Sequence, residues 1–292
     1  MKIAYLVHSY REYDEVIESI NQLIKQGDHV FIMINDNDLR EKIHFVYAES
    51  PKVHISSVQE YAQEGDLSMA RGTILQLKEA VELGGFDYFI NLSDGMMPIK
   101  TREDIVAYLE TKKTNFYSID RSEAEDENLR KKTLKFYPLT NLLSFPTGKI
   151  SRAVAKGSGA IFNIFGIRRK LDDEILIGSP YFILNHKSAA VLAQNFDYVS
   201  ETFKLAWYAE EMYIPMMLKK FNMEDHINDD LRVIGPNGKW IESQAPREVN
   251  LETIQKYPEA LFAAQIHADK DPSLYQEYFD IYNRNLPPKE EE

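Results

Sequence analysis

The stretch "SMARGTILQLKEAVELGGFDYFINLSDG", residues 68–95, decides the fold class of this chain. Apolar side chains recur at helical spacing between Met69 and Val81, which predicts an amphipathic helix. Two glycines end that helix, and the apolar run at residues 86–93 predicts a buried strand. A helix that leads directly into a buried strand is the repeating unit of an α/β domain.

The N-terminal sequence shows the same pattern. Apolar runs at residues 2–8, 29–36 and 52–57 predict strands, and residues 13–26 predict a helix that ends at Gly27. We therefore expect strand, helix, strand and strand with short connections. This order is how a doubly wound α/β domain opens.

The sequence that follows the quoted stretch continues the alternation. A helix is expected to begin with Thr101 as N-cap and Asp104 at its third helical position, as in a capping box. Residues 121–170 are rich in Lys, Gly, Ser and Pro and predict loops with short helical pieces. Further elements are predicted as strands at 114–119 and 174–184 and helices at 186–196 and 208–221, the last with Pro215 in its first turns. We expect one domain over residues 1–284 and a frayed tail at 285–292.

Composition excludes several classes of protein. The chain has 292 residues and no cysteine, so disulfides, thiolate metal sites and a Cys nucleophile are excluded. A reducing compartment suits such a chain. The N-terminal apolar run, residues 3–7, is far shorter than a signal peptide or a membrane span requires. We expect a soluble, cytoplasmic protein.

The charge is acidic overall but unevenly distributed. A formal net charge of −12 argues against a general nucleic-acid binder. Residues 128–170 nevertheless contain no Asp or Glu and ten cations, which are Arg130, Lys131, Lys132, Lys135, Lys149, Arg152, Lys156, Arg168, Arg169 and Lys170. This segment is either a solvated basic face or a surface for an anionic substrate or an anionic membrane.

Motifs of several other enzyme classes are absent from the sequence. The first expected strand is not followed by Gly-x-Gly-x-x-Gly, and there is no Walker-type Gly-Lys-Ser/Thr loop, which disfavours dehydrogenases and kinases. The seven histidines show no His-Glu-x-x-His spacing, so a zinc hydrolase has little support.

Polar residues end three of the expected strands, where open α/β sheets bind ligands. His8 ends the first strand, the "NDND" motif (residues 35–38) follows the second, and Asp94 follows the strand of the quoted stretch. The motif predicts either a turn or a contact of Asn35 or Asp36 with a uracil or ribose. Asp94 stands alone where a metal-dependent sugar transferase has Asp-x-Asp.

Two adjacent carboxylates, Glu210 and Glu211, interrupt the aromatic and aliphatic run "LAWYAEEMYIPMML". Neighbours on a helix point about 100° apart, so if one faces water the other faces a cleft. A solvated first-turn carboxylate, favoured by the helix dipole, explains Glu210 adequately. A carboxylate at a helix N-terminus stays ionised, which suits a general base that removes a proton from a sugar hydroxyl.

Seven blocks of the chain resemble, in order, those of the core-2/I-branching glycosyltransferase family. That family includes the branching β-1,6-N-acetylglucosaminyltransferases and the peptide xylosyltransferases. The blocks are "KIAYLVHSY" (2–10), "FIMIND" (31–36), and residues 64–81, 86–109, 177–192, 208–218 and 245–271. The chain departs from the family pattern with Met33, Ile34 and Asn35 in place of His-Val-Asp, Glu64 in place of Trp, and Asp94 before rather than after the glycine.

The resemblance implies an inverting, metal-independent enzyme of GT-A fold that uses a UDP-sugar. It also implies a single Rossmann-like domain whose central mixed, mostly parallel sheet is flanked by helices. By position, Glu211 matches the family's catalytic base and Glu210 the preceding Asp. Arg247 matches the Arg that binds the diphosphate through charge-assisted hydrogen bonds. Gln265 occupies the place of the family's Lys, and the candidate replacements are His267, Lys239 or a basic residue within 128–170.

These matches assign the parts of the domain and the site. The expected parts are a nucleotide-sugar-binding half (1–120), a basic loop and helical segment (121–170) and an acceptor-side and diphosphate-binding half (171–284). The nucleotide-sugar site is assigned to His8, Asn35, Asp36, Ser68, Asp94, Arg247, Gln265 and His267. The acceptor side is assigned to Gly95, Met96, Gly178, Ser179, Trp207 and Tyr208. The resemblance implies no metal and no cofactor besides the UDP-sugar co-substrate.

The lack of cysteine and of an anchor separates this chain from the lumenal members of the family. We therefore expect a bacterial enzyme at the cytoplasmic face that acts on a lipid-linked or protein-bound glycan, with residues 128–170 touching an anionic membrane. Two alternatives stay open. One is a non-catalytic binding protein with a degenerate transferase fold, and the other is a metal-dependent GT-A transferase that uses Asp36 and Asp38.

Overall fold

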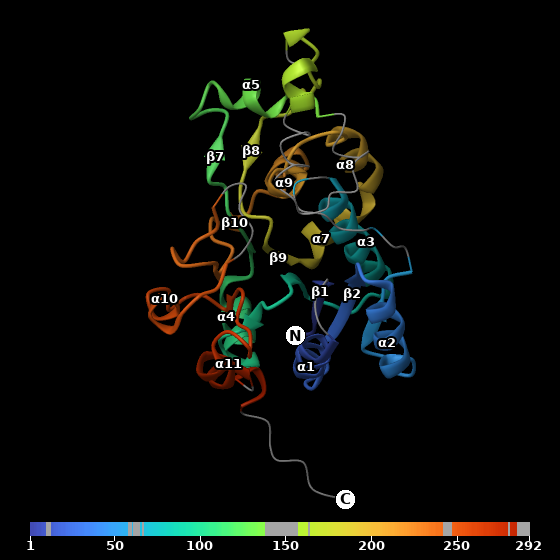
Figure 1. Ribbon diagram of the computed structural model, residues 1–292, viewed down its shortest axis with the longest axis vertical. Helices are drawn as coiled ribbons and strands as arrows, with labels where there is room; N and C mark the ends of the chain where they lie inside the picture. The colour runs from blue at the N-terminus through green and yellow to red at the C-terminus, as the bar shows by residue number, and fades with distance from the viewer. Residues whose placement is uncertain are drawn as a thin grey trace, which may run out of the picture.

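A seven-stranded mixed sheet forms the centre of the protein. The computed structural model describes residues 1–9, 13–57, 60, 65, 67–137, 157–162, 164–241, 247–279 and 281–284. The sheet has the order β10-β6-β9-β4-β1-β2-β3 (Figure 1). Its strands are β1 (Ile3–Ser9), β2 (His29–Ile34), β3 (Val53–Ile55), β4 (Tyr88–Ser93), β6 (Asn115–Tyr117), β9 (Phe182–Asn185) and β10 (His226–Ile227). All run parallel except β9, which is antiparallel to β4 and β6.

Helices cover both faces of this sheet (Figure 1). On one face lie α3 (Leu67–Leu83), α7 (His186–Gln194), α8 (Phe196–Thr202) and α9 (Tyr213–Lys220). On the other face lie α1 (Tyr13–Ile24), α2 (Asn37–Tyr47) and α4 (Arg102–Lys112). The predicted α/β class, a central and mostly parallel sheet flanked by helices, is confirmed.

Strand β1 explains why the strands read as continuous apolar runs rather than alternating ones. Successive side chains of a strand point to opposite faces of the sheet. Ala4 and Leu6 pack in the core beneath α3, whereas Tyr5 and Val7 pack in the core beneath α1. Because helices cover both faces, both sets of positions must be apolar.

Two small sheets flank the central one. The first joins β11 (Arg232–Val233), β12 (Phe262–Ala263) and β5 (Met97–Pro98), and the second joins β7 (Arg121–Ser122) to β8 (Leu176–Ile177). The remaining elements are α5 (Leu129–Thr133), η1 (Ala209–Glu211), α10 (Leu251–Gln255), α11 (Pro272–Phe279) and η2 (Ile281–Asn283). Within the described ranges, no helix combines the length and apolar character needed to cross a bilayer.

A buried ion pair ties the start of β1 to α4 and to the C-terminal segment. Asp28 is fully buried and accepts from the Arg102 guanidinium at 2.5 and 2.9 Å. The Tyr282 hydroxyl donates to the same carboxylate at 2.6 Å and lies 2.8 Å from the Tyr5 hydroxyl. Because a charge buried this deeply is costly when unpaired, the network fixes these distant segments to one another.

The sequence pattern did not predict α2. The expectation that two strands follow one another directly between residues 29 and 57 is wrong, because α2 lies between β2 and β3. This helix buries just three side chains, Leu39, Ile43 and Tyr47, so its apolar periodicity is weak. Its start was nevertheless signalled, since the Asp36 carboxylate accepts from the Leu39 N–H at 2.7 Å as an N-cap.

Candidate active site

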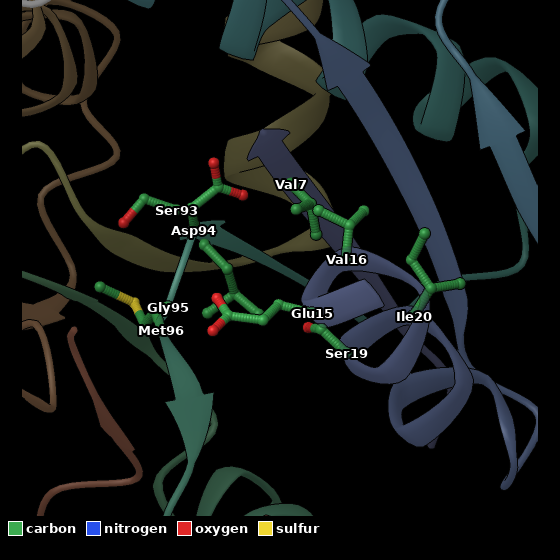
Figure 2. Close-up of a pocket in the computed structure, with 10 residues that line it drawn as sticks. Val7, Glu15, Val16, Ser19, Ile20, Ser93, Asp94, Gly95 and Met96 are labelled. Carbon is green, nitrogen blue, oxygen red and sulfur yellow. The ribbon is translucent and has the colours of Figure 1, made fainter. Parts of the chain in front are cut away.

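The carboxyl ends of β1 and β4 border a small hollow of about 30 Å³. Its lining comes from β1, β4, the first turns of α1 and the turn that follows β4. The lining residues are Val7, Glu15, Val16, Ser19, Ile20, Leu92, Ser93, Asp94, Gly95 and Met96. Figure 2 shows Glu15 on α1 extending toward the turn that carries Asp94 and Gly95. This edge of the sheet is where open α/β folds bind their ligands.

A chain of hydrogen bonds beside this hollow ends on His267. The Gln265 amide nitrogen donates to the Asp94 carbonyl at 3.1 Å, which turns the Gln265 amide oxygen toward His267 Nε2, also at 3.1 Å. His267 Nδ1 lies 3.0 Å from a Glu15 carboxylate oxygen. Both ring nitrogens therefore lie within hydrogen-bond distance of side-chain oxygens. His267 is buried, and these two contacts fix the orientation of its ring.

Gly95 makes room for this histidine. A Cβ on Gly95 would lie 2.3 Å from His267 Cε1, and its φ of +69° is one that residues with a side chain rarely adopt. Ile266 also donates its backbone N–H to the Gly95 carbonyl at 2.9 Å. The turn after β4 and the segment after β12 are thus packed backbone to backbone, which places Asp94, Gly95, Gln265 and His267 together.

Arg247 lies at the end of the β11-β12-β5 sheet from which Gln265 and His267 follow. Strands β11 and β12 run parallel, so Gly235, which follows β11, lies at the end where Gln265 follows β12. A Cβ on Gly235 would lie 3.3 Å from the Arg247 Cβ. Arg247 is exposed there, and among the described residues nothing pairs with its guanidinium. The structure therefore places Arg247 and His267, which were predicted to bind the diphosphate, at the same end of this small sheet.

Glu210 and Glu211 lie in η1, and both are buried, at 5% and 4% exposure. One Glu210 carboxylate oxygen accepts from the Gly65 backbone N–H at 2.7 Å, which joins η1 to the segment that precedes α3. The interpretation of Glu210 as a solvated first-turn carboxylate is therefore wrong. Its charge is compensated by a backbone donor instead of by water.

The backbone of Glu211 is also held by the segment that follows β8. The Gly178 N–H donates to the Glu211 carbonyl at 2.9 Å, and the Ser179 N–H donates to the Ser118 hydroxyl at 2.8 Å. Tyr208, which precedes η1, has a left-handed φ of +55° and donates its N–H to the Gly65 carbonyl at 3.0 Å. A non-glycine residue in this conformation stores strain, which is common at functional sites.

The predicted acceptor-side residues separate into two groups. Gly178, Ser179, Trp207 and Tyr208 gather around the two glutamates, and the Trp207 and Tyr208 rings meet edge to face at 5.5 Å. Gly95 and Met96 instead line the hollow. A hydrogen bond of 3.0 Å between the Tyr181 hydroxyl and the Ser93 hydroxyl joins the two regions through β9 and β4.

The predicted nucleotide-binding residues at the other strand ends are spread out. His8 points to the α3 face, where its Nε2 lies 3.2 Å from the Thr73 hydroxyl, and burial lowers its pKa to about 4. A Cβ on Gly72 would lie 2.9 Å from the His8 ring, so α3 packs closely on it. Asp36 caps α2, Asn35 lies half-buried after β2, and Ser68 lies half-buried in the first turn of α3.

The described residues contain no cluster of three His, Asp or Glu side chains arranged to hold a metal ion. Asp36 and Asp38, the two residues proposed for a metal-dependent transferase, have different surroundings. The Asp36 carboxylate serves as the cap of α2, and Asp38 is exposed in the first turn of that helix.

The family of the protein is shown by a match over most of its length. The profile of the Core-2/I-Branching enzyme family matches residues 3–258. The chain belongs to this family. As a Core-2/I-Branching enzyme it is a glycosyltransferase, and its mostly parallel sheet flanked by helices has the predicted α/β class.

Among solved structures similar to this Core-2/I-Branching enzyme is that of a protein from S. aureus. The crystal structure of TarS from S. aureus is similar at 14% sequence identity with a TM-score of 0.29. The match covers 41% of this chain and 22% of the TarS chain, so the chain spans about a fifth of TarS. A comparison with curated proteins found no match.

Three site residues of this Core-2/I-Branching enzyme were not foreseen. Glu15 holds His267, Gly65 holds Glu210, and Ser118 packs against Gly178 and binds Ser179. Glu15 had a signal, because it lies in the first turn of the helix that follows the first strand, where α/β domains bind ligands. The contacts of Gly65 and Ser118 join residues far apart in the chain, which a single sequence does not reveal.

Proposed function

We propose that this Core-2/I-Branching enzyme transfers a sugar from a UDP-sugar to a hydroxyl of a glycan, with inversion, by direct displacement. The observation that carries the proposal is the placement of Glu211. It lies buried in η1, with its backbone bound to Gly178 and its neighbour Glu210 bound to Gly65. A residue whose backbone is held in this way suits a base that must meet an attacking hydroxyl in one geometry.

In this mechanism Glu211 accepts the proton of the acceptor hydroxyl as its oxygen attacks the anomeric carbon. The bond from that carbon to the UDP oxygen breaks as the new glycosidic bond forms on the opposite face, which inverts the configuration. Glu210 acts as a positioning residue, because its carboxylate holds the segment that leads into α3. The aromatic rings of Trp207 and Tyr208 would form one wall of the acceptor site.

The departing UDP carries negative charge that the protein must stabilise. Arg247 is exposed at the edge of the small sheet where His267 also lies, and its guanidinium would supply the positive charge. His267 would then replace the Lys whose place is taken by Gln265. This arrangement supports transfer without a metal, and we propose no cofactor besides the UDP-sugar.

The experiment that tests the proposal compares Glu211→Gln with Glu210→Gln. We expect Glu211→Gln to lower turnover by about 10²–10⁴-fold while UDP affinity stays within twofold, because a general base contributes about that much. Glu210→Gln keeps an amide oxygen for the Gly65 N–H, so we expect a smaller loss. Release of UDP in the presence of candidate glycan acceptors measures turnover, and calorimetric titration measures UDP binding. Full activity in Glu211→Gln would remove it from the mechanism.

Two further results would favour the alternatives. Complete loss of transfer in EDTA with recovery in manganese would indicate a metal-dependent transferase, and Asp36→Asn with Asp38→Asn would then abolish that recovery. If the protein binds UDP but releases none from any mixture of UDP-sugar and acceptor, it is a binding protein.

We propose a lipid-linked or protein-bound glycan at the cytoplasmic face as the acceptor.

A further inference from the structure

Four apolar side chains protrude together from the segment that includes the helical residues 157–162. Ile161, Ile164, Phe165 and Ile167 are 57%, 81%, 74% and 45% exposed, and we name them the apolar tip. They account for four of the nine large apolar side chains that are exposed in the described parts of the chain. Figure 1 shows this segment at one end of the long axis, beyond α5 and α8. Contiguous exposed apolar surface of this kind marks an interaction site.

Cations surround the base of the apolar tip. Backbone pairing of Lys135 with Arg168, and a 3.1 Å hydrogen bond from the Arg168 guanidinium to the Lys131 carbonyl, bring the two segments together. Lys131, Arg168 and Lys170 are exposed, and with the half-buried Lys135 they form what we name the cationic collar. No Asp or Glu occurs from residue 128 to residue 170.

Carboxylates flank the basic segment on both sides, and some of its cations are internal. Asp173 and Glu174 bind Lys220 and Lys219 at 2.8 and 2.6 Å, whereas Glu127 and Asp172 are exposed. Arg130 pairs with Glu123 and bonds to backbone carbonyls, and Arg169 is buried against the Thr202 carbonyl. The collar is therefore the solvent-facing part of the basic segment, and the acidic residues begin two positions after Lys170.

Aromatic contacts connect the tip to the acceptor side. Phe162, in the tip helix, packs against Phe136 at 5.4 Å between ring centroids, and the adjacent Tyr137 packs against Trp207 at 5.3 Å. Trp207 in turn contacts Tyr208, which leads into η1 and the two glutamates. Packed aromatic rings thus connect the tip to the acceptor side.

We propose that the apolar tip inserts into the interface of an anionic phospholipid bilayer while the cationic collar binds the lipid headgroups. Apolar side chains next to Lys and Arg suit the two layers of an anionic bilayer surface. The tip would leave water for the acyl-chain region, and the collar would contact the negatively charged headgroups. Docking in this way turns the acceptor side toward the membrane. Docking does not depend on the transfer reaction; the placement of an acceptor there rests on the proposed function.

Flotation of the full chain with vesicles tests the proposal. We expect the protein to float with equimolar phosphatidylcholine and phosphatidylglycerol at low salt, and to float poorly with phosphatidylcholine alone. Ile164→Ser with Phe165→Ser should lower the partition coefficient at least about tenfold, because two apolar side chains are lost from the interface. Lys131→Gln with Lys170→Gln should lower it about twentyfold, since each cation contributes about fivefold.

Matched controls are available elsewhere on the surface. Phe45 is 86% exposed on α2, far along the chain from the tip, so Phe45→Ser should leave flotation unchanged. Lys187→Gln, at an exposed position of α7, should do the same. All replaced side chains are exposed, and unchanged melting temperatures would show that the variants fold.

Two outcomes would overturn the docking proposal. One is absence of flotation with anionic vesicles at low salt. The other is a tip variant that floats normally but no longer self-associates in sedimentation, which would assign the tip to a second copy of the chain. The binding measurement uses no nucleotide-sugar, so a failure to dock and a failure to transfer sugar are observed separately.

Discussion

The backbone N–H of Gly178 donates to the carbonyl oxygen of Glu211 at 2.9 Å, so the residue that follows β8 holds the backbone of the candidate base directly. Gly178 is fixed from its other side as well. A Cβ at this position would lie 1.8 Å from the Ser118 carbonyl oxygen, a separation that no relaxation of a side chain could relieve. The position of Glu211 therefore depends on the lack of a side chain at residue 178.

Replacement of Gly178 by Ala tests this dependence. The new methyl group must push the segment after β8 away from the Ser118 backbone, so we expect a loss of unfolding free energy of about 2 kcal/mol or more. Transfer should fall in addition, because the Glu211 carbonyl is bound to that segment and its backbone would move with it. Urea unfolding and UDP release measure the two effects. Gly157→Ala is the control, since a Cβ there meets nothing within 4 Å; equal effects of both substitutions would contradict the expectation.

The pairing of His267 with Glu15 predicts a change in nucleotide affinity. His267→Ala removes the ring that packs against Gly95 and contacts Gln265 and Glu15, and we expect UDP to bind about tenfold more weakly because this edge of the site loses its fixed geometry. Calorimetric titration measures the affinity. Unaltered affinity would place the diphosphate away from His267.

Burial of His8 predicts a pH dependence of stability. Its pKa falls from the ordinary 6.5 to about 4, so in the folded protein it stays neutral where the unfolded chain is already protonated. The unfolded state then binds more protons, and stability should decrease as the pH falls from about 6.5 to about 4, by about 3 kcal/mol. Above pH 6.5 this contribution is fully present.

Urea unfolding across this pH range, with His8→Gln as the variant, measures the effect. The pKa of His29 shifts in the same direction, so the difference between the two proteins isolates His8. We expect a flatter profile in His8→Gln. Parallel profiles would show that His8 does not cause the dependence.

The ion pair of Asp28 with Arg102 predicts a large loss of stability when one partner is removed. Arg102→Met leaves the fully buried Asp28 carboxylate without its cation, which costs about 3 kcal/mol or more at neutral pH. Lys256→Met is the comparison, because its partner Glu252 is exposed and screened by water. Chemical unfolding should separate the two variants clearly, and equal stabilities would show that the buried pair adds nothing.

Local signals in the sequence predicted most of the central fold. Thr101 caps α4 with its hydroxyl bound to the Asp104 N–H, as its capping box predicts, and Pro215 falls in the first turn of α9. Gly27, at φ +90°, follows α1 where the pattern ends. These features depend on neighbours a few residues apart, which one sequence contains in full.

The site could be predicted only in outline. The position of Glu211 followed from the resemblance, but the burial of Glu210 depends on Gly65, and the orientation of His267 depends on Glu15, more than 200 residues earlier in the chain. Such contacts are set by the crossing of distant segments. The basic segment shows the same limit, since its sequence gave no way to separate the internal Arg130 and Arg169 from the exposed collar.

The row of packed rings from Phe162 to Tyr208 also gives the protein an optical reporter. Trp207 belongs to that row, and Trp240 is the other tryptophan of the chain. In a Trp240→Phe background, the emission of Trp207 would report the environment where the tip joins the acceptor side. The emission spectrum of Trp207 could then report both binding of the protein to a vesicle and binding of a glycan, without an attached dye.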